Sequence, residues 1–585
     1  MKSSMVPGHT WLFPGEPLSY DEYLKELPSE MVIAIAIMMN NELETQLGYE
    51  AQQERIFKAL TYRFTPQQKQ YVQEAFLLFK QRTNGLFSED IFRREYFMKI
   101  ILKETRRNAV FELTDLSPQQ EVNFFMAYML LIDEINRADF SMLEELRKYE
   151  TDPLGIYISS WTANLSKFQF NERVSPLFEI FKLGCLAKYA LHNWRIHLKE
   201  YLNFFGLNTI GNLMHFFNTG IQAALRFEKD KVITNLSYIV PNINVSVNPF
   251  SGQSINAMIG TEKEVKLSDF KLFPLFHNKE RGYMVMDKNF YFKKIYRGPL
   301  FELCKNTGLR SMGFNKYSGE VSKKVVEESC FQAIAKVLAG DERDVLYFDN
   351  SSNDGFPDCY IRKGNIVLLF ECKANILAEL HLDEIQPQKA IERFNAFKDY
   401  LDDRFIATKN GSPKGITQLK NQIALLTEEG KCSFDSAFPK LIAEEQVIIY
   451  PMICHDDFNF SMPGINEYLN DRFIELLKPF KEINLVVKDM TVIRMENLFD
   501  LVLRQGSFNT LKGFLDCYWQ IISERKMQWL ANTKYNDPLP SRRSFDELYS
   551  TNFIHELPNV GSIPKPLDSL LNTAGITQDI LNETV

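Results

Sequence analysis

Three charged side chains stand around an apolar run in the stretch DGFPDCYIRKGNIVLLFECKA, residues 354–374. Asp358 follows a proline, and Glu371 and Lys373 lie at the end of the run that begins at Ile366. A buried strand has no structural need for charges at its end, because an unpaired charge in an apolar interior is costly. The residue types therefore indicate that this stretch carries chemistry.

The same stretch predicts a β-hairpin with a two-residue turn at Lys363–Gly364, where glycine tolerates the positive φ of a tight turn. In that register Asp358 lies opposite Leu369. Side chains alternate along a strand, so Asp358, Glu371 and Lys373 converge on one face, away from the turn. A three-residue turn would reverse this arrangement.

Two carboxylates held a few ångströms apart repel each other unless a cation lies between them. Oxygen ligands such as those of Asp358 and Glu371 favour Mg²⁺ or Mn²⁺ over zinc. Such an ion lowers the pKa of a bound water and neutralises charge that builds on a phosphate. The Lys373 ammonium would orient that water or stabilise the transition state. These groups suit hydrolysis of a phosphodiester.

The residues resemble the motif of the PD-(D/E)xK nuclease superfamily, which has the restriction-endonuclease-like fold. Pro357-Asp358 is similar to the PD element, and Glu371-Cys372-Lys373 is similar to the (D/E)xK element. The resemblance covers roughly residues 315–460, where a helix, a strand, the hairpin, a helix and a strand are expected. That order is the family's αβββαβ core.

The resemblance implies a metal-dependent nuclease. Asp358, Glu371 and the main-chain carbonyl of Cys372 would hold Mg²⁺ or Mn²⁺, and Lys373 would be catalytic. By resemblance alone, DNA is favoured over RNA as the substrate. Large proteins with such a domain are often similar to bacterial restriction or anti-phage defence effectors, so antiviral defence is the expected role. Many nucleases of this fold are dimers, so a homodimer or a partner chain is also expected.

The family usually adds an acid from the first helix of the core, and this sequence offers Glu320, Glu327 and Glu328. Glu327 lies on the helical row of Phe331 and Leu338, so it faces the core side, whereas Glu328 faces outward. An acid on an apolar row needs a partner. We therefore predict Glu327 as the fourth catalytic residue, with Glu320 as the alternative.

A later helix, expected near 416–428, carries Ile416, Leu419 and Ile423 at core spacing. Gln418 lies elsewhere on this helix. It resembles a glutamine that some members of the superfamily place there to contact the substrate.

Two other interpretations of the charged stretch remain open. The first is a surface salt bridge that closes a hairpin. The second is a catalytically inactive nuclease-like fold that acts as a nucleic-acid-binding or partner-binding scaffold or sensor. Metal-dependent cleavage would distinguish an enzyme from both.

The sequence pattern predicts that the chain is divided into four segments, one of which contains this site. Residues 1–230 read as helical, with Thr-Pro and Ser-Pro helix starts in FTPQQKQYVQEAF and LSPQQEVNFF. Residues 231–314 are predicted to form a bridging segment of mixed secondary structure. Residues 315–500 predict the α/β nuclease-like domain, and 501–585 predict a helical C-terminal extension and tail.

The composition limits the class of protein. With 45% apolar and 24% charged residues, the 585-residue chain is typical of a folded multidomain protein. Its net charge of −8 argues against a protein that coats nucleic acid nonspecifically. Its eight cysteines show no zinc-binding spacing. No apolar run is long enough for a bilayer and no signal peptide is apparent, so we expect a cytoplasmic protein without membrane contact.

Overall fold

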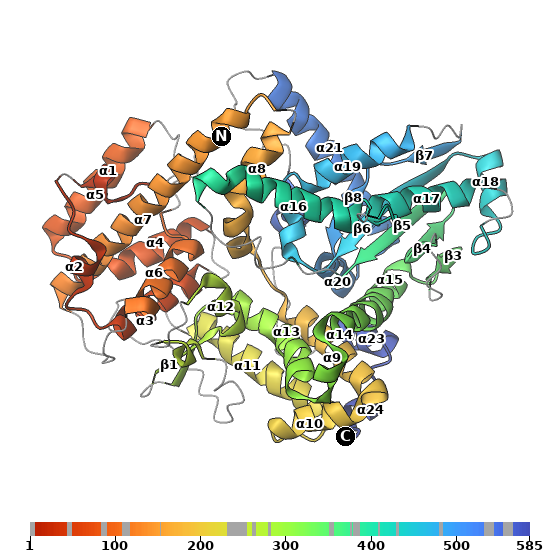
Figure 1. Ribbon diagram of the computed structural model, residues 1–585, viewed down its shortest axis with the longest axis horizontal. Coiled ribbons are helices and arrows are strands. Elements are labelled where there is room, and N and C mark those ends of the chain that lie inside the picture. Colours follow the sequence, from red (N-terminus) through yellow and green to blue (C-terminus); the bar gives the residue numbers. More distant parts are fainter. Residues whose placement is uncertain are drawn as a thin grey trace.

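The computed structural model (Figure 1) is rich in helices and contains a mixed β-sheet, which confirms the expected mixed α/β class. It describes all residues of the chain except 1–5, 14, 44–48, 84–90, 108–116, 153, 231–253, 260–264, 279–281, 350–355, 375–376, 378–385, 408–409, 429–431, 479–483, 532–542 and 554–564.

The described residues before 231 form helices. They are α1 (His9–Leu12), α2 (Tyr20–Leu24), α3 (Ser29–Glu42), α4 (Tyr49–Leu60), α5 (Pro66–Thr83), α6 (Arg94–Arg107), α7 (Pro118–Leu146), α8 (Gly155–Phe168), α9 (Pro176–Asn193), α10 (Arg195–Phe204) and α11 (Ile210–Asp230). Both predicted helix starts are present. At α7 the Ser117 hydroxyl accepts from the Gln120 N–H, and the Gln120 side chain accepts in return from the Ser117 N–H.

A small antiparallel sheet and two helices follow: α12 (Leu267–Leu272), β1 (Leu275–Asn278), β2 (Gly282–Val285) and α13 (Lys288–Asn306). Strand β2 thus leads into a helix, and Asp287 caps that helix by accepting from the Phe290 N–H at 3.0 Å. Residues 231–253, the first part of the predicted mixed bridging segment, lie outside the described residues.

The main sheet has six strands: β3 (Val345–Tyr347), β4 (Cys359–Lys363), β5 (Ile366–Lys373), β6 (Val447–His455), β7 (Leu485–Val487) and β8 (Thr491–Arg494). The order is β3-β4-β5-β6-β7, and β8 pairs with a later part of β6. The first three strands are antiparallel, whereas β6, β7 and β8 continue the sheet in parallel. The sequence did not predict β7 and β8, because three or four residues are too few to show a period.

The hairpin between β4 and β5 turns one residue later than predicted. Lys363 pairs with Ile366, so the turn residues are Gly364 and Asn365. Gly364 has a φ of 59°, a conformation that glycine adopts at little cost. The predicted turn at Lys363–Gly364 is therefore wrong by one position.

The predicted strand pairing is also corrected. Tyr360, and not Asp358, lies opposite Leu369. The register has moved by two residues, which preserves the alternation of faces. Continued one pair beyond Cys359 and Phe370, it sets Asp358 beside Glu371. The predicted sharing of a face survives the correction, and the two acids lie closer than the predicted register implied.

Strand β5 is buried on both faces. Leu368 and Phe370 belong to one hydrophobic core, and Val367 and Leu369 belong to another. The first core lies under one long helix, formed by α14 (Phe314–Val321), the π-helical segment η6 (Ser322–Phe331) and α15 (Gln332–Ala339). The second lies under α16 (Ala390–Phe405), α17 (Gly415–Thr427), α18 (Phe438–Glu444) and α19 (Ile465–Leu477). Helices thus cover both sides of the sheet.

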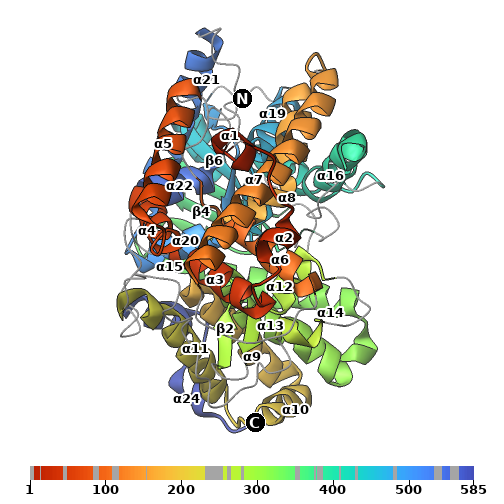
Figure 2. The same ribbon diagram turned by 90° about the vertical axis from the view of Figure 1, so that its left-hand side faces the viewer.

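The C-terminal helices pack back onto earlier parts of the chain. They are α20 (Met495–Leu503), α21 (Phe508–Ala531), α22 (Phe545–Phe553), α23 (Lys565–Thr573) and α24 (Gln578–Asn582). In Figure 2, α24 and the C-terminus lie beside α10 and α11, and the Val585 N–H donates to the Asn208 carbonyl at 3.1 Å. The largest core draws on all four predicted segments, for example through Phe181, Tyr291, Phe370 and Leu511. The segment boundaries themselves stay predictions.

Replacing Leu368 by alanine should lower the free energy of unfolding by about 2–5 kcal/mol, because a fully buried leucine leaves a cavity between the sheet and its helices. The denaturant midpoint of this variant measures the loss. Ile474→Ala is the control, because this side chain is 42% exposed and should shift the midpoint little. Equal shifts in the two variants would contradict a central position for β5.

Candidate active site

The predicted charged residues lie at one end of the central strand β5. Glu371 and Lys373 are among its last three residues, and Asp358 immediately precedes β4. The parallel neighbour β6 ends at the same edge, where Lys373 pairs with His455. Strand ends at the carboxyl edge of parallel strands are where side chains from several elements meet in α/β folds. The sheet therefore brings the three predicted residues together.

Asp358 is tied to the end of β5. Its Oδ2 accepts a hydrogen bond from the Cys372 N–H at 2.7 Å, which fixes one carboxylate oxygen beside the strand. Burial, and then the nearby Glu371 carboxylate, hold the pKa of Asp358 well above its usual range. The positive charge near Asp358 therefore does not offset the burial and the Glu371 charge that favour the neutral form of its carboxyl group.

Glu371 is 1% exposed and has a partner for each carboxylate oxygen. Its Oε1 accepts from Lys373 Nζ at 2.6 Å, and its Oε2 accepts from Gln422 Nε2 at 2.8 Å. Buried carboxylates persist only when they are paired or hydrogen-bonded in this way.

Lys373 is held between Glu371 and helix α17. Its ammonium also donates to Gln418 Oε1 at 3.1 Å, and that oxygen accepts in addition from the Gly415 N–H at 2.9 Å. Burial alone would lower the pKa of Lys373, but the charges of Glu371 and Asp358 outweigh it and raise the pKa above its usual value. The lysine therefore stays charged, and Gln418 helps to position it.

Gln422 belongs to the site and was not predicted from the sequence. It is 1% exposed, bonds Glu371, and also donates to the Phe356 carbonyl at 3.3 Å. Its own Oε1 is buried without a hydrogen-bond partner. The available signal was its spacing, because residues four apart share one face of a helix and Gln418 was already singled out.

Glu327 is the acid from the preceding helix that reaches the site. It lies in the π-helical segment η6 and accepts from the Ala374 N–H, while Ser322 of the same segment donates to the Ala374 carbonyl at 3.3 Å. Burial, only partly offset by Lys373, raises the pKa of Glu327 to about 7. Single π-helical segments often occur at functional sites.

The two other acids of this helix point elsewhere. Glu320 accepts from the Tyr189 hydroxyl at 2.6 Å, and Glu328 pairs with Lys324 at 2.7 Å. The geometry thus agrees with the choice of Glu327 over Glu320, because Glu327 bonds the residue that follows Lys373.

The site is suited chemically to a hard divalent cation. Asp358 and Glu371 offer carboxylate oxygens, and Gln422 adds a buried amide oxygen without a partner. Cys372 can contribute only its main-chain carbonyl, because its thiol is buried in the core on the opposite face of β5. Across the ranges that the structure describes, no cluster of three or more His, Cys, Asp or Glu side chains is arranged to hold a metal.

The acids that follow β6 form ion pairs with other helices. Asp456 pairs with Lys182 of α9 at 3.0 Å. Asp457 accepts from the Leu377 N–H at 2.8 Å and lies 3.6 Å from Arg297 of α13. These contacts anchor the polar end of β6, which has the sequence CHDD at 454–457.

Comparison of the chain with protein-family models, with curated proteins and with solved structures gave no match. In the part of the chain that the structure describes, no helix is both long and apolar enough to cross a membrane.

The raised pKa of Glu327 predicts a pH-dependent stability in the presence of a chelator. Its usual value is 4.5, so the folded protein binds a proton more tightly than the unfolded chain between about 4.5 and 7. Stability should therefore fall as the pH rises through this window, by at most roughly 3 kcal/mol. Chemical denaturation of the wild type and of Glu327→Gln at pH 5, 6, 7 and 8 measures the effect. The variant should show a shallower slope, because Asp358, whose pKa is also raised, still contributes in both proteins, and parallel curves would exclude Glu327 as a source.

Proposed function

We propose that the chain is a metal-dependent nuclease of the PD-(D/E)xK type. The observation that carries the proposal is the convergence of Asp358, Glu371 and Lys373 at the end of β5, with Glu327 bonded to the adjacent Ala374. Carboxylates and an ammonium in this arrangement suit hydrolysis of a phosphodiester.

The order of elements supports the restriction-endonuclease-like core. A long helix, the antiparallel strands β3, β4 and β5, helices α16, α17 and α18, and the parallel strand β6 follow one another along the chain. This order is similar to the αβββαβ arrangement of that superfamily. The motif residues also occupy the hairpin at the centre of that arrangement.

Each residue has a role in this proposal. Asp358, Glu371 and the carbonyl of Cys372 would hold Mg²⁺ or Mn²⁺, which supplies an activated water and neutralises phosphate charge. Lys373, kept charged and aimed by Gln418, stabilises the negative charge of the transition state. Gln422 orients Glu371. Glu327 assists near neutral pH, where its carboxyl exchanges a proton.

The proposed substrate is DNA in preference to RNA, and the proposed setting is antiviral defence or restriction in the cytoplasm. Both extend the resemblance of the motif. A homodimer or a partner chain is part of the proposal, because a single site of this kind cuts one strand.

A second candidate function is that of a catalytically inactive scaffold or sensor that binds nucleic acid or a partner. The Lys373–Glu371 ion pair at 2.6 Å favours it, because this pair engages one of the Glu371 carboxylate oxygens that would otherwise be offered to a metal ion. The two candidates differ in metal-dependent cleavage.

Lys373→Ala should reduce the cleavage of plasmid and linear DNA in Mg²⁺ by about 100- to 1,000-fold, because it removes the group that stabilises the transition state. Lys363→Ala is the matched control. It lies on the same hairpin, but its ammonium pairs at the surface with Glu342. Gel assays with Mg²⁺, Mn²⁺ or EDTA, at matched thermal melts, measure the rates. Cleavage by Lys373→Ala at the wild-type rate would remove the nuclease proposal, and no cleavage by the wild type favours the scaffold.

Calorimetry should detect binding of at least one Mg²⁺ or Mn²⁺ to the wild type and weaker binding to Asp358→Asn. This change removes one charged ligand but keeps an acceptor for the Cys372 N–H. Asp341→Asn is the control, because its exposed carboxylate lies on the loop before β3. Equal affinities of the wild type and Asp358→Asn would exclude Asp358 as a ligand.

A further inference from the structure

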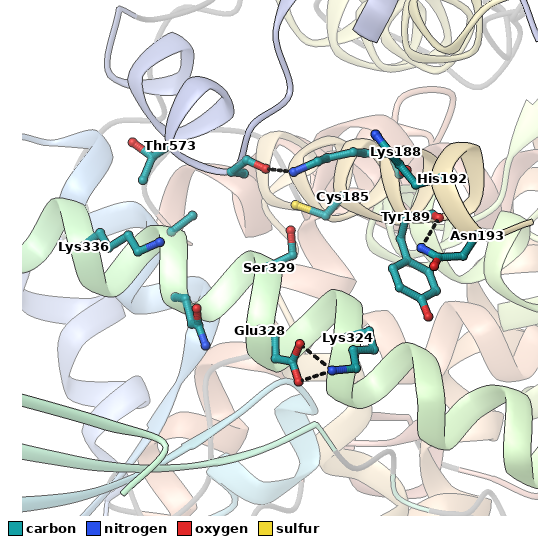
Figure 3. Close-up of a pocket in the computed structure, with 13 residues that line it drawn as sticks. Cys185, Lys188, Tyr189, His192, Asn193, Lys324, Glu328, Ser329, Lys336 and Thr573 are labelled. Carbon is teal, nitrogen blue, oxygen red and sulfur yellow. Dashed lines mark hydrogen bonds and ion pairs between the residues drawn. The ribbon is translucent and has the colours of Figure 1, made fainter. Parts of the chain in front are cut away.

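A pocket of about 350 Å³ lies on the other side of the helix that carries Glu327 (Figure 3). Three segments that are far apart in the sequence form it: α9, the helical segment η6–α15, and the end of α23. Its volume is near the lower end of the range of small-molecule sites, about 300–1,000 Å³. The pocket therefore has room for a small organic molecule rather than for a single ion.

The charged groups of the pocket are mainly basic. Its lining includes Lys188, Lys324 and Lys336, and Glu328 is the single carboxylate among the lining residues. Lys324 pairs with Glu328, whereas Lys188 donates to the Ala574 carbonyl at 2.6 Å, which is an uncharged partner. An excess of positive charge in a chain of net charge −8 favours an anionic ligand here.

One neutral donor of the lining suits a phosphate oxygen. The Asn193 amide donates one N–H to the Tyr189 carbonyl at 3.0 Å and has a second N–H beside the lysines, and Tyr189 adds an aromatic ring. Lysine ammonium and neutral donors together are the usual partners of a phosphate group. An aromatic ring at the same site suits the flat part of a nucleotide.

The pocket and the candidate active site share one helix. Glu327 and Glu328 are neighbours in the π-helical segment, and only Glu327 faces the site, whereas Glu328 lines the pocket. The same segment is bonded to the main chain of Ala374 through Glu327 and through Ser322. A ligand that shifts this segment would therefore shift Glu327 relative to Lys373.

We propose that this pocket binds a small phosphate-bearing anion of about nucleotide size, through Lys188, Lys324 and Lys336. We further infer that its occupancy alters the position of Glu327 and so regulates cleavage. The second statement rests on the proposed nuclease function, whereas the first does not.

Calorimetry with ATP, AMP, pyrophosphate and inorganic phosphate tests the binding. At least one of these compounds should bind the wild type. The double variant Lys324→Gln/Lys336→Gln should bind it at least tenfold more weakly, since each lysine supplies a charge-assisted hydrogen bond. Both side chains are exposed, so the variant should fold, and its thermal melt verifies this. Lys316→Gln is the control, because this exposed lysine precedes the same segment but does not line the pocket.

Asn193→Ala provides a second binding variant that leaves every charge in place and should also weaken binding. A short single-stranded DNA oligonucleotide forms the last arm of the experiment. If only the oligonucleotide binds, and the double variant abolishes that binding, the pocket belongs to a nucleic-acid path and the proposal is overturned. Failure of all four small compounds to bind, or equal affinities in wild type and double variant, overturns it as well.

Cleavage assays with and without the bound compound test the regulation. The compound should change the rate at least severalfold in the wild type and in Lys316→Gln, but not in the double variant. An unchanged rate in the wild type rejects regulation alone. Binding without any cleavage would reject the proposed nuclease function and support the proposed pocket ligand. Cleavage without any small-molecule binding would reject the pocket ligand and support the nuclease function.

Discussion

The burial of β5 on both faces is the constraint on which the candidate site depends. This strand pairs with β4 on one edge and with β6 on the other, and its side chains enter two separate cores in alternation. Such a strand has no room for charge along its length, because each buried ion would need its own partner. Polar chemistry is confined to its end, where Glu371 and Lys373 lie and where Asp358 closes onto the Cys372 N–H.

Electrostatic balance at that end explains the arrangement of the surrounding helices. The ammonium of Lys373 faces three carboxyl groups, and the pKa values of Asp358 and Glu327 are raised because burial and mutual repulsion favour their neutral forms. Helix α17 contributes two amide side chains, Gln418 and Gln422, which fix Lys373 and Glu371 without adding charge. The π-helical segment on the other face contributes Glu327, so both cores support one site.

Much of this architecture follows from local properties that the sequence alone displays. Thr-Pro and Ser-Pro starts determine where α5 and α7 begin, because the cap satisfies main-chain N–H groups within one turn. Two-residue alternation places Asp358, Glu371 and Lys373 on one face, and it does so in the predicted register and in the observed one. The row of Phe331 distinguishes Glu327 from its neighbour for the same kind of reason, since a helical period is a property of the segment itself.

Tertiary structure decided what no short segment contains. The turn moved to Gly364–Asn365 because pairing with β3 and β6 sets the register of the whole hairpin. The short strands β7 and β8 form because each pairs with β6 along its edge. Gln422 enters the site only because α17 lies across β5, and the pocket beside α9 joins residues nearly 400 positions apart, as in the contact of Lys188 with Ala574. Such contacts depend on which surfaces pack together, and that is settled by the burial of apolar area over the whole chain.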